Sequence, residues 1–449
     1  MLSRRKSFRP RKGRLFLAVC LLLPGVAAAQ TPAEWKTVLE RLDRLESENR
    51  SLREEVGELR RLVSDGGPQS GVEERLAIQE ERIREQAQTK VESSQRLPLR
   101  VTGMALFNAF LNGRASGGAD NPPLAARISG SAAGGASLRQ SVVGLQYEGT
   151  STVWGGKVRG SLYADFFGGT GDSLNQQARI RTGSIELEWR SRSILAGQEK
   201  PIFAPREPNS LAQVGISPLT GAGNLWRWQP QIRVEQRFRL GQHARFSAQL
   251  GVLQTSEETT AVPSDYAPTV ARRRPGFEGR FLFSKDLDHT RRLEIAPGFH
   301  TSTSHVAGTS IPSNLFSLDW FANPWRKLEF TGAFFSGQNV GHFGSPRQGF
   351  TVISEYLVIP VHSRGGWAQL SLLATQRLSF NLMGGRHDDR NRDLLPGQVG
   401  KNTAGAANVM YRLSPNVIVS LEASQVRTDY LGVGTRINNH YDLALAYLF

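Results

Sequence analysis

The chain has 449 residues, a formal net charge of +15, 46 glycines and one cysteine. Beyond the N-terminus no apolar run reaches the roughly 18 residues that a membrane-spanning helix needs, so helical membrane spans are excluded. The basic surplus is scattered along glycine- and aromatic-rich segments instead of being clustered, which argues against a nucleic-acid partner.

The N-terminus has the pattern of an export signal. Seven Lys and Arg residues precede an apolar run at 15–23, and three alanines at 27–29 offer a cleavage site before Gln30. We therefore predict a signal peptide over residues 1–29. Cys20 lies inside it, so the mature chain should hold no disulfide or thiolate site. A lipoprotein anchored at Cys20 is the alternative, although Val19 is a poor residue before a lipidated cysteine.

Residues 30–96 are predicted to form a periplasmic coiled coil and linker. A seven-residue repeat places Trp35, Leu42, Asn49, Val56 and Val63 at one position and Val38, Leu45, Leu52 and Leu59 at the other. Such spacing keeps one apolar stripe facing a partner helix, and a buried Asn in that stripe can fix the register and the number of chains. An amphipathic helix packed on its own domain is the alternative, but nothing nearby in the sequence supplies a partner core.

Residues 97–449 are predicted to form an all-β, transmembrane antiparallel barrel. From Leu99 onward, segments of about ten residues alternate apolar and polar side chains, as in barrels that face lipid outside and water inside. In the clearest segment Ile232, Val234, Phe238 and Leu240 alternate with Arg233, Glu235, Arg237 and Arg239. Five tryptophans near predicted strand ends fit the membrane interface, and ordinary packing is the alternative for any one of them: Trp154, Trp189, Trp320, Trp325 and Trp367.

We place sixteen strand starts along this region, and short turns alternate with long loops between them. The starts lie near Arg100, Arg139, Val153, Arg181, Arg192, Pro230, His243, Gly276, Arg291, Asn314, Trp325, Gly365, Arg377, Thr403, Asn416 and Ile437. Gly241-Gln242, Asn323-Pro324 and Ser414-Pro415 are predicted short turns. Residues 350–357 could also form a strand, and we place them within a long loop. An even strand number with short periplasmic turns and long extracellular loops is typical of bacterial barrels.

The final segment presents Tyr441, Leu443, Leu445, Tyr447 and Phe449 on one face. This pattern resembles the C-terminal strand by which the outer-membrane barrel assembly machinery recognises its clients. We therefore expect that machinery as a partner through the Phe449 strand, membrane lipid as the surroundings of the barrel, and the bacterial outer membrane as the location.

The region from Gly197-Gln198 to Trp228-Gln229-Pro230-Gln231-Ile232-Arg233 resembles the DcaP-like porins. That family has a Gly-Gln strand end, a pore-narrowing third loop and an Arg-Gln-Pro-Gln-Ile-Arg strand start. Trp228 replaces the first Arg of the motif here, and Arg227 stands one place earlier. The resemblance also covers the order of signal, coiled coil, sixteen-strand barrel and terminal Phe, and it implies a homotrimer that admits small anions.

These observations predict a porin for passive diffusion of small, anionic, hydrophilic solutes. If Ile232 and Val234 face lipid, the alternating charges face the lumen, because a lipid-facing guanidinium at the bilayer midplane costs about 2–4 kcal/mol. The resemblance brings the third loop inward as well. The pore-lining candidates are Lys200, Arg206, Glu207, Arg227, Arg233, Glu235, Arg237 and Arg239. The alternative for these charges is that Arg and Glu pair across the lumen to hold the loop, leaving little net field.

No catalytic constellation, metal site or cofactor is predicted. The eight histidines show no ligand spacing beside an acid or thiol, and His387 with Asp388 and Asp389 is the nearest approach to one. Glycine runs such as 168–171 lack the strand-to-helix context and the Lys of a phosphate loop. The alternative function is a structural barrel tethered to the cell wall through its coiled coil, with a barrel enzyme as a third possibility.

Overall fold

The computed structural model describes residues 99–169, 176–255, 275–306, 308–346, 349–354 and 357–449, together with Ser47 and Glu54. The predicted signal peptide and coiled coil otherwise lie outside the described residues. Residues Leu97–Phe449 form one compact unit. No helix among the described residues is long and apolar enough to cross a membrane.

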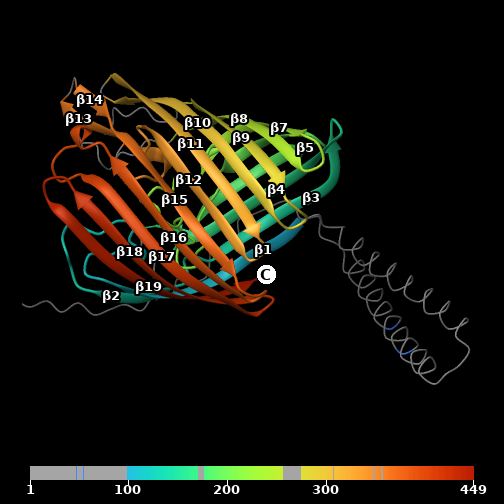
Figure 1. Ribbon diagram of the computed structural model, residues 1–449, viewed down its shortest axis with the longest axis horizontal. Helices are drawn as coiled ribbons and strands as arrows, with labels where there is room; N and C mark the ends of the chain where they lie inside the picture. Colours follow the sequence, from blue (N-terminus) through green and yellow to red (C-terminus); the bar gives the residue numbers. More distant parts are fainter. Residues whose placement is uncertain are drawn as a thin grey trace, which may run out of the picture. The chain divides into compact units, whose positions relative to one another are not determined.

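This unit is a closed antiparallel β-barrel (Figure 1). Its strands are β1 (Leu99–Asn112), β2 (Ala133–Ser137), β3 (Val142–Val153), β4 (Gly156–Gly168), β5 (Gln177–Glu188), β6 (Arg192–Glu199), β7 (Gln229–Arg239), β8 (Ala244–Gln254), β9 (Pro275–Asp286), β10 (Arg292–Val306), β11 (Thr309–Trp325), β12 (Leu328–Gln338), β15 (His362–Leu373), β16 (Leu378–Asp389), β17 (Val399–Ser414), β18 (Val417–Tyr430) and β19 (Gly434–Leu448). Strand β1 pairs with β19 on one side and with β2 and β3 on the other, which closes the sheet.

The seventeen strands of the sheet make sixteen wall positions, as predicted. Strands β2 and β3 lie end to end against β1, because Ser137 pairs with Asn108 and Val142 pairs with Met104. The interruption between them frees Gln140 from the ladder. The Gln140 side chain is buried and bonds to other parts of the chain, as described below.

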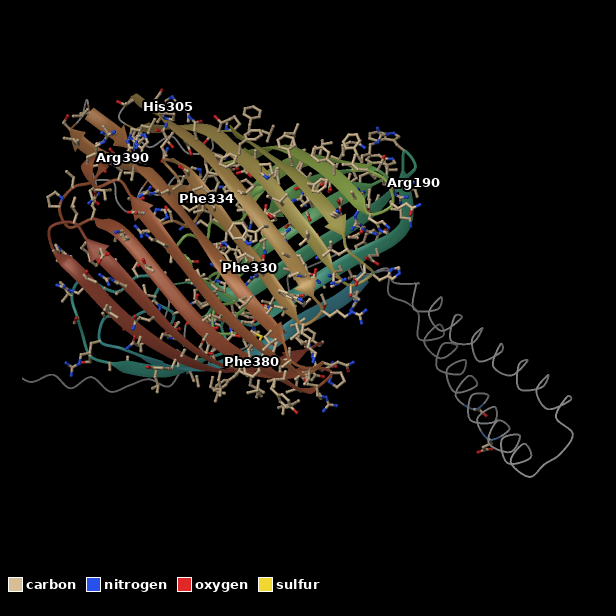
Figure 2. All side chains as sticks on the ribbon, viewed as in Figure 1. Arg190, His305, Phe330, Phe334, Phe380 and Arg390 are labelled. Carbon is tan, nitrogen blue, oxygen red and sulfur yellow. The ribbon has the colours of Figure 1, made fainter. Side chains whose placement is uncertain are left out.

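The outer wall is apolar, which confirms the predicted alternation. Ile232 is 60% exposed and Phe238 48% exposed on β7, whereas Gln231 is buried on the other face. Figure 2 labels Phe330, Phe334 and Phe380, which belong to the same class of exposed apolar side chains on the wall. Exposed apolar side chains alternating with inward polar ones are the pattern of a barrel surrounded by lipid.

Trp367 does not lie at the membrane interface, so that prediction is wrong for this residue. Its side chain is 3% exposed, at the middle of β15, and it packs with Leu219, Met383 and Ala404 inside the barrel. The other wall tryptophans include Trp154 and Trp325, which lie beside turns and are 86% and 65% exposed. Side chains two residues apart on a strand share a face, so Trp367 lies on the same buried, inward face of β15 as Gln369.

The connections follow the predicted alternation, with the following differences. The short turn after β11 follows Trp325, so Asn323 and Pro324 belong to the strand. Two connections at the long-loop end are short, since β11 begins at Thr309 after β10 ends at Val306, and β19 begins at Gly434 after β18 ends at Tyr430. The loop after β12 carries a hairpin of its own, β13 (Phe350–Ser354) and β14 (Leu357–Pro360), outside the barrel sheet.

Candidate channel constriction

The connection between β6 and β7, residues 200–228, folds into the barrel, and we call it the inward loop. Its buried apolar residues include Ile202, Phe203, Leu219 and Trp226, although it begins and ends in the wall. A loop this long would ordinarily lie at the surface, where water satisfies its backbone. Here side chains of the barrel wall satisfy the loop's backbone instead.

The first part of the inward loop is anchored to β9–β11 by ion pairs. Arg206 Nε donates to Asp319 Oδ1 at 2.6 Å, and a second Arg206 nitrogen donates to Glu294. Asp319 is fully buried and also accepts two bonds from Arg280, at 2.7 and 2.9 Å. Burial alone would lower the pKa of Arg206, but its hydrogen bonds to Glu294 and Asp319 and the negative charges of these carboxylates outweigh burial, so the pKa is raised. Arg206 is therefore a paired anchor of the loop.

The middle of the inward loop is held to the segment between β2 and β3 and to β18. Gln140 Oε1 accepts the backbone N–H groups of Val214 and Gly215 at 2.7 and 2.8 Å. The Gln140 amide donates to the Ala212 carbonyl at 2.8 Å. On the same side of the barrel, Ser210 Oγ donates to Glu422 Oε2 of β18 at 2.5 Å. Because β11, which holds Arg206, lies across the barrel from β3, the loop spans the lumen.

The last part of the inward loop packs against the loop that follows β12. Trp226 N donates to the Phe343 carbonyl at 2.9 Å. Phe203, from the start of the inward loop, meets the Phe343 ring edge to face with centroids 4.9 Å apart. Gly223 has a φ of +101°, and a Cβ there would collide with the carbonyl oxygens of Gly366 and Arg386. A glycine is needed at this point because the loop backbone lies directly on the wall.

An arginine cluster on β5 faces the inward loop, and its residues are not among the predicted pore-lining candidates. Asp165 on β4 is fully buried and accepts two bonds from Arg179, at 2.9 and 3.0 Å, and one from Arg181 at 3.0 Å. Arg181 also donates to the Val214 carbonyl at 2.7 Å. Both guanidinium groups lie over the Trp228 ring, 5.1 and 4.8 Å from its centroid. The sequence did contain a signal for this cluster, because Arg179 and Arg181 flank Ile180 on a predicted strand and Asp165 lies on the preceding one.

The predicted pore-lining residues divide into paired and unpaired groups. Lys200 forms an ion pair with Glu207 at 2.9 Å, and Arg237 forms one with Glu188 at 3.0 Å. Arg227, at the end of the inward loop, is half-buried and acts electrostatically on His342. The side chains of Arg233, Glu235 and Arg239 make no ion pair within the described residues, and Arg233 and Glu235 are partly exposed on the inward face of β7.

Inward-facing side chains keep contact with solvent mainly along β4–β7. The side chains of Arg159, Arg179 and Arg237 are 48%, 31% and 37% exposed. Elsewhere on the inner wall, the side chains of Arg280, Gln369 and Glu422 are buried. Solvent therefore reaches the inner wall beside the arginine cluster, where basic side chains outnumber the acidic ones that pair with them.

The described residues hold no cluster of three metal-ligating side chains. His387 bonds to Asp389 at 2.8 Å, and Asp388 faces the other side of β16, where it pairs with Arg386. The three residues that came nearest to a ligand cluster in the sequence therefore do not converge on one point.

No protein-family profile and no curated protein matches this chain. Among solved structures, the outer membrane channel DcaP of Acinetobacter baumannii aligns with 78% of this chain and 97% of its own length, at 16% identity and a TM-score of 0.63. An anion-selective porin from Comamonas acidovorans aligns with 78% of this chain and 99% of its own length, at 13% identity and a TM-score of 0.54. This chain has the barrel fold of these two outer-membrane proteins.

Proposed function

We propose that this protein is an outer-membrane porin that admits small, hydrophilic, anionic solutes by passive diffusion. The observation that carries the proposal is the inward loop, which crosses the lumen and leaves partly exposed basic side chains along β4–β7. The apolar outer wall supports a lipid-surrounded barrel. Likeness in fold to DcaP and to an anion-selective porin is consistent with the same role.

The preference for anions rests on the balance of charge beside the inward loop. Arg179 and Arg181 share one carboxylate, that of Asp165, so this cluster keeps an excess of positive charge. Arg233 adds an unpaired guanidinium on the inward face of β7. In a narrow space with little screening, a basic wall attracts anions and repels cations. Glu186, Glu188, Glu199, Glu207 and Glu235 reduce this field without cancelling it.

Conductance in a planar bilayer tests the proposal. The purified full-length protein should give stepwise ion currents at micromolar or lower concentration. Detergent from a mock purification serves as the control. A barrel that serves only as a structural tether would give no current, so silence in repeated insertions of folded protein would refute the porin proposal.

Assembly and export are further parts of the proposal. The heptad pattern from Trp35 to Val63 supports association between chains at their periplasmic ends. The choice of three chains rests on the resemblance to the DcaP-like porins. The export signal supports cleavage after Ala29, with a mature N-terminus at Gln30 and no lipid on Cys20. The terminal strand supports recognition by the barrel assembly machinery, since Tyr441, Tyr447 and Phe449 lie on its outward, exposed face.

A further inference from the structure

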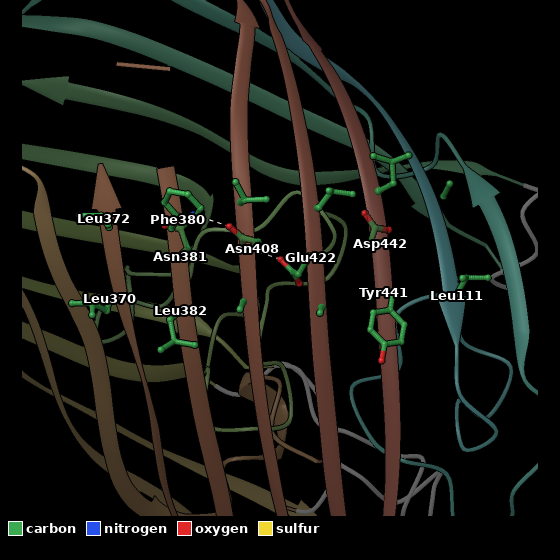
Figure 3. Close-up of a pocket in the computed structure, with 16 residues that line it drawn as sticks. Leu111, Leu370, Leu372, Phe380, Asn381, Leu382, Asn408, Glu422, Tyr441 and Asp442 are labelled. Carbon is green, nitrogen blue, oxygen red and sulfur yellow. Dashed lines mark hydrogen bonds between the residues drawn. The ribbon is translucent and has the colours of Figure 1, made fainter. Parts of the chain in front are cut away.

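The outer wall carries one apolar hollow that the porin proposal does not use. It has a volume of about 790 Å³ and lies across β15–β19 and β1. Figure 3 shows Leu370, Leu382, Tyr441 and Leu111 around it. Because these side chains are 41–64% exposed, the hollow opens to the outside of the barrel. We call it the wall groove.

The strand register explains why the groove exists. One cross-strand row runs from Leu382 through Ala407 and Ala423 to Tyr441. The two alanines stand side by side between much larger neighbours, so the wall is thin at the middle of the row. The next row toward the turns contains Phe380, Val409, Leu421 and Leu443, and it forms the lower edge of the groove.

The floor of the groove is fixed from behind. Asn381 donates to Asn408 at 2.7 Å, and Asn408 donates to Glu422 at 3.0 Å, all on the inward face of the same strands. Ser210 of the inward loop also bonds to Glu422. These buried bonds join the three strands directly behind the groove and hold its floor in place.

Above the groove, toward the long-loop end, the outward face changes from apolar to basic. Gly384 and Gly405 are paired neighbours, so the passage from the groove to the loop end is not blocked by side chains. Next comes a row in which Thr403 pairs with both Arg386 and Arg427. The side chains of these two arginines are 53% and 58% exposed. We call Arg386, Arg427 and the neighbouring Arg364 and Lys401 the basic rim.

The rim keeps a positive excess. Arg386 and Arg364 share the carboxylate of Asp388, and Arg427 lies 3.7 Å from Asp429. Four cations thus face two carboxylates. Exposed guanidinium groups bind phosphate through two parallel hydrogen bonds, which makes a pair of arginines in one row a suitable phosphate contact.

From the groove and its rim together, we infer that this face binds one phosphorylated glycolipid of the outer leaflet, of the lipid A type. An acyl chain lies in the groove and a phosphate contacts Arg386 and Arg427. The rim lies at the long-loop end, which is extracellular in barrels of this kind, so the lipid comes from the outer leaflet. A second copy of the chain fits less well, because its wall would bury the four rim cations against only two carboxylates.

The inference rests on the proposed outer-membrane location and is independent of conductance. The test is native mass spectrometry of the full-length protein purified in mild detergent, with lipid A added and, separately, phosphatidylglycerol. Wild type should retain one lipid A per barrel. The double variant Arg386→Glu, Arg427→Glu should lose at least tenfold in retention, and Ala407→Phe with Ala423→Phe should lose the acyl contact to a similar degree.

Matched controls separate binding from folding. Lys285→Glu changes an exposed charge at the turn end of β9, and Ala105→Phe adds bulk to an exposed position of β1; both should retain lipid A like wild type. Single-channel conductance should be unchanged in the rim variant, which shows that the barrel is folded and keeps this test apart from that of the porin proposal. Equal retention in all variants, equal retention of phosphatidylglycerol, or disulfide cross-linking of Ala423→Cys between copies would overturn the inference.

Discussion

Arg206 of the inward loop and Asp319 of β11 are 113 residues apart in the chain, yet Arg206 Nε lies 2.6 Å from Asp319 Oδ1. The carboxylate is fully buried and carries a second arginine, Arg280. This pair ties the loop that narrows the lumen to the wall that faces it. The position of the constriction therefore depends on a small number of buried charges.

Asp319→Asn should release the first part of the inward loop. The substitution leaves Arg206 and Arg280 without their shared carboxylate, and breaking a buried ion pair costs about 3–5 kcal/mol. We expect a lower midpoint of unfolding in denaturant and a larger, noisier single-channel conductance. Arg206→Met is the milder partner variant, because Asp319 then keeps Arg280. Wild-type conductance and stability in Asp319→Asn would show that this pair does not hold the loop.

Gln140→Ala should loosen the middle of the inward loop. Two backbone N–H groups, those of Val214 and Gly215, lose their acceptor, and each unsatisfied buried donor costs about 1–3 kcal/mol. Hydrogen exchange followed by mass spectrometry should show faster exchange in peptides covering residues 210–216. Gln146→Ala is the control, because Gln146 lies on β3 close to Gln140 in the chain but bonds to Tyr163 and not to the inward loop. Unchanged protection at 210–216 would contradict the anchoring role of Gln140.

His342 should make the barrel less stable in mild acid. Burial keeps the pKa of His342 well below its ordinary value of 6.5, and His300 and Arg227 lower it further. Below pH 6.5 the His342 ring takes up a proton in the unfolded chain but not in the folded chain. The free energy of unfolding is therefore full above pH 6.5 and falls as the pH decreases below it.

His342→Leu should make the free energy of unfolding fall less steeply in acid, by about 1.4 kcal/mol per pH unit, because one proton fewer is taken up on unfolding. Unfolding in denaturant at several pH values between 7.5 and 5.5 measures the slope. His243→Leu, at an exposed turn position, should keep the wild-type slope. Parallel slopes for His342→Leu and wild type would mean that the ring is protonated in the folded state or accessible to solvent.

Deleting residues 35–91 should weaken association between chains without unfolding the barrel. The heptad stripe lies within this segment, whereas the barrel unit begins at Leu97. Mass photometry in mild detergent should show trimers for the full chain and a shift toward monomers for the deletion. A monomeric full-length protein would remove the basis for the trimer.

The barrel could be predicted because the alternation of apolar and polar side chains is visible within each strand's own sequence. On β7 the alternation of Ile232 and Val234 with Arg233 and Glu235 assigns the two faces within a few residues, and the exposed fractions agree. The same reasoning failed for Trp367, since its position near a strand end suggested the interface while its parity placed it inside. Parity along the strand was the more reliable signal.

The constriction could be predicted only in part. Resemblance indicated that the loop at 200–228 turns inward, but the partners of its charges come from strands far away in the sequence. Arg206 meets Glu294 and Asp319, and Arg237 meets Glu188, only because the barrel closes. Local sequence cannot show which lumen charges are neutralised, so Arg206 was proposed to line the pore and Arg179 and Arg181 were missed.

The reversal potential in a KCl gradient tests the central claim most directly. Wild type should favour Cl⁻, because the arginine cluster of β5 and the unpaired Arg233 leave the inner wall basic. Arg233→Glu should move the reversal potential toward K⁺ selectivity, and Arg237→Glu should add to it less directly, since Arg237 is already paired with Glu188. Lys285→Glu, on the outer wall, should have no effect. A cation-selective wild-type channel, or an Arg233→Glu channel with unchanged reversal potential, would contradict the assignment of this wall as the anion path.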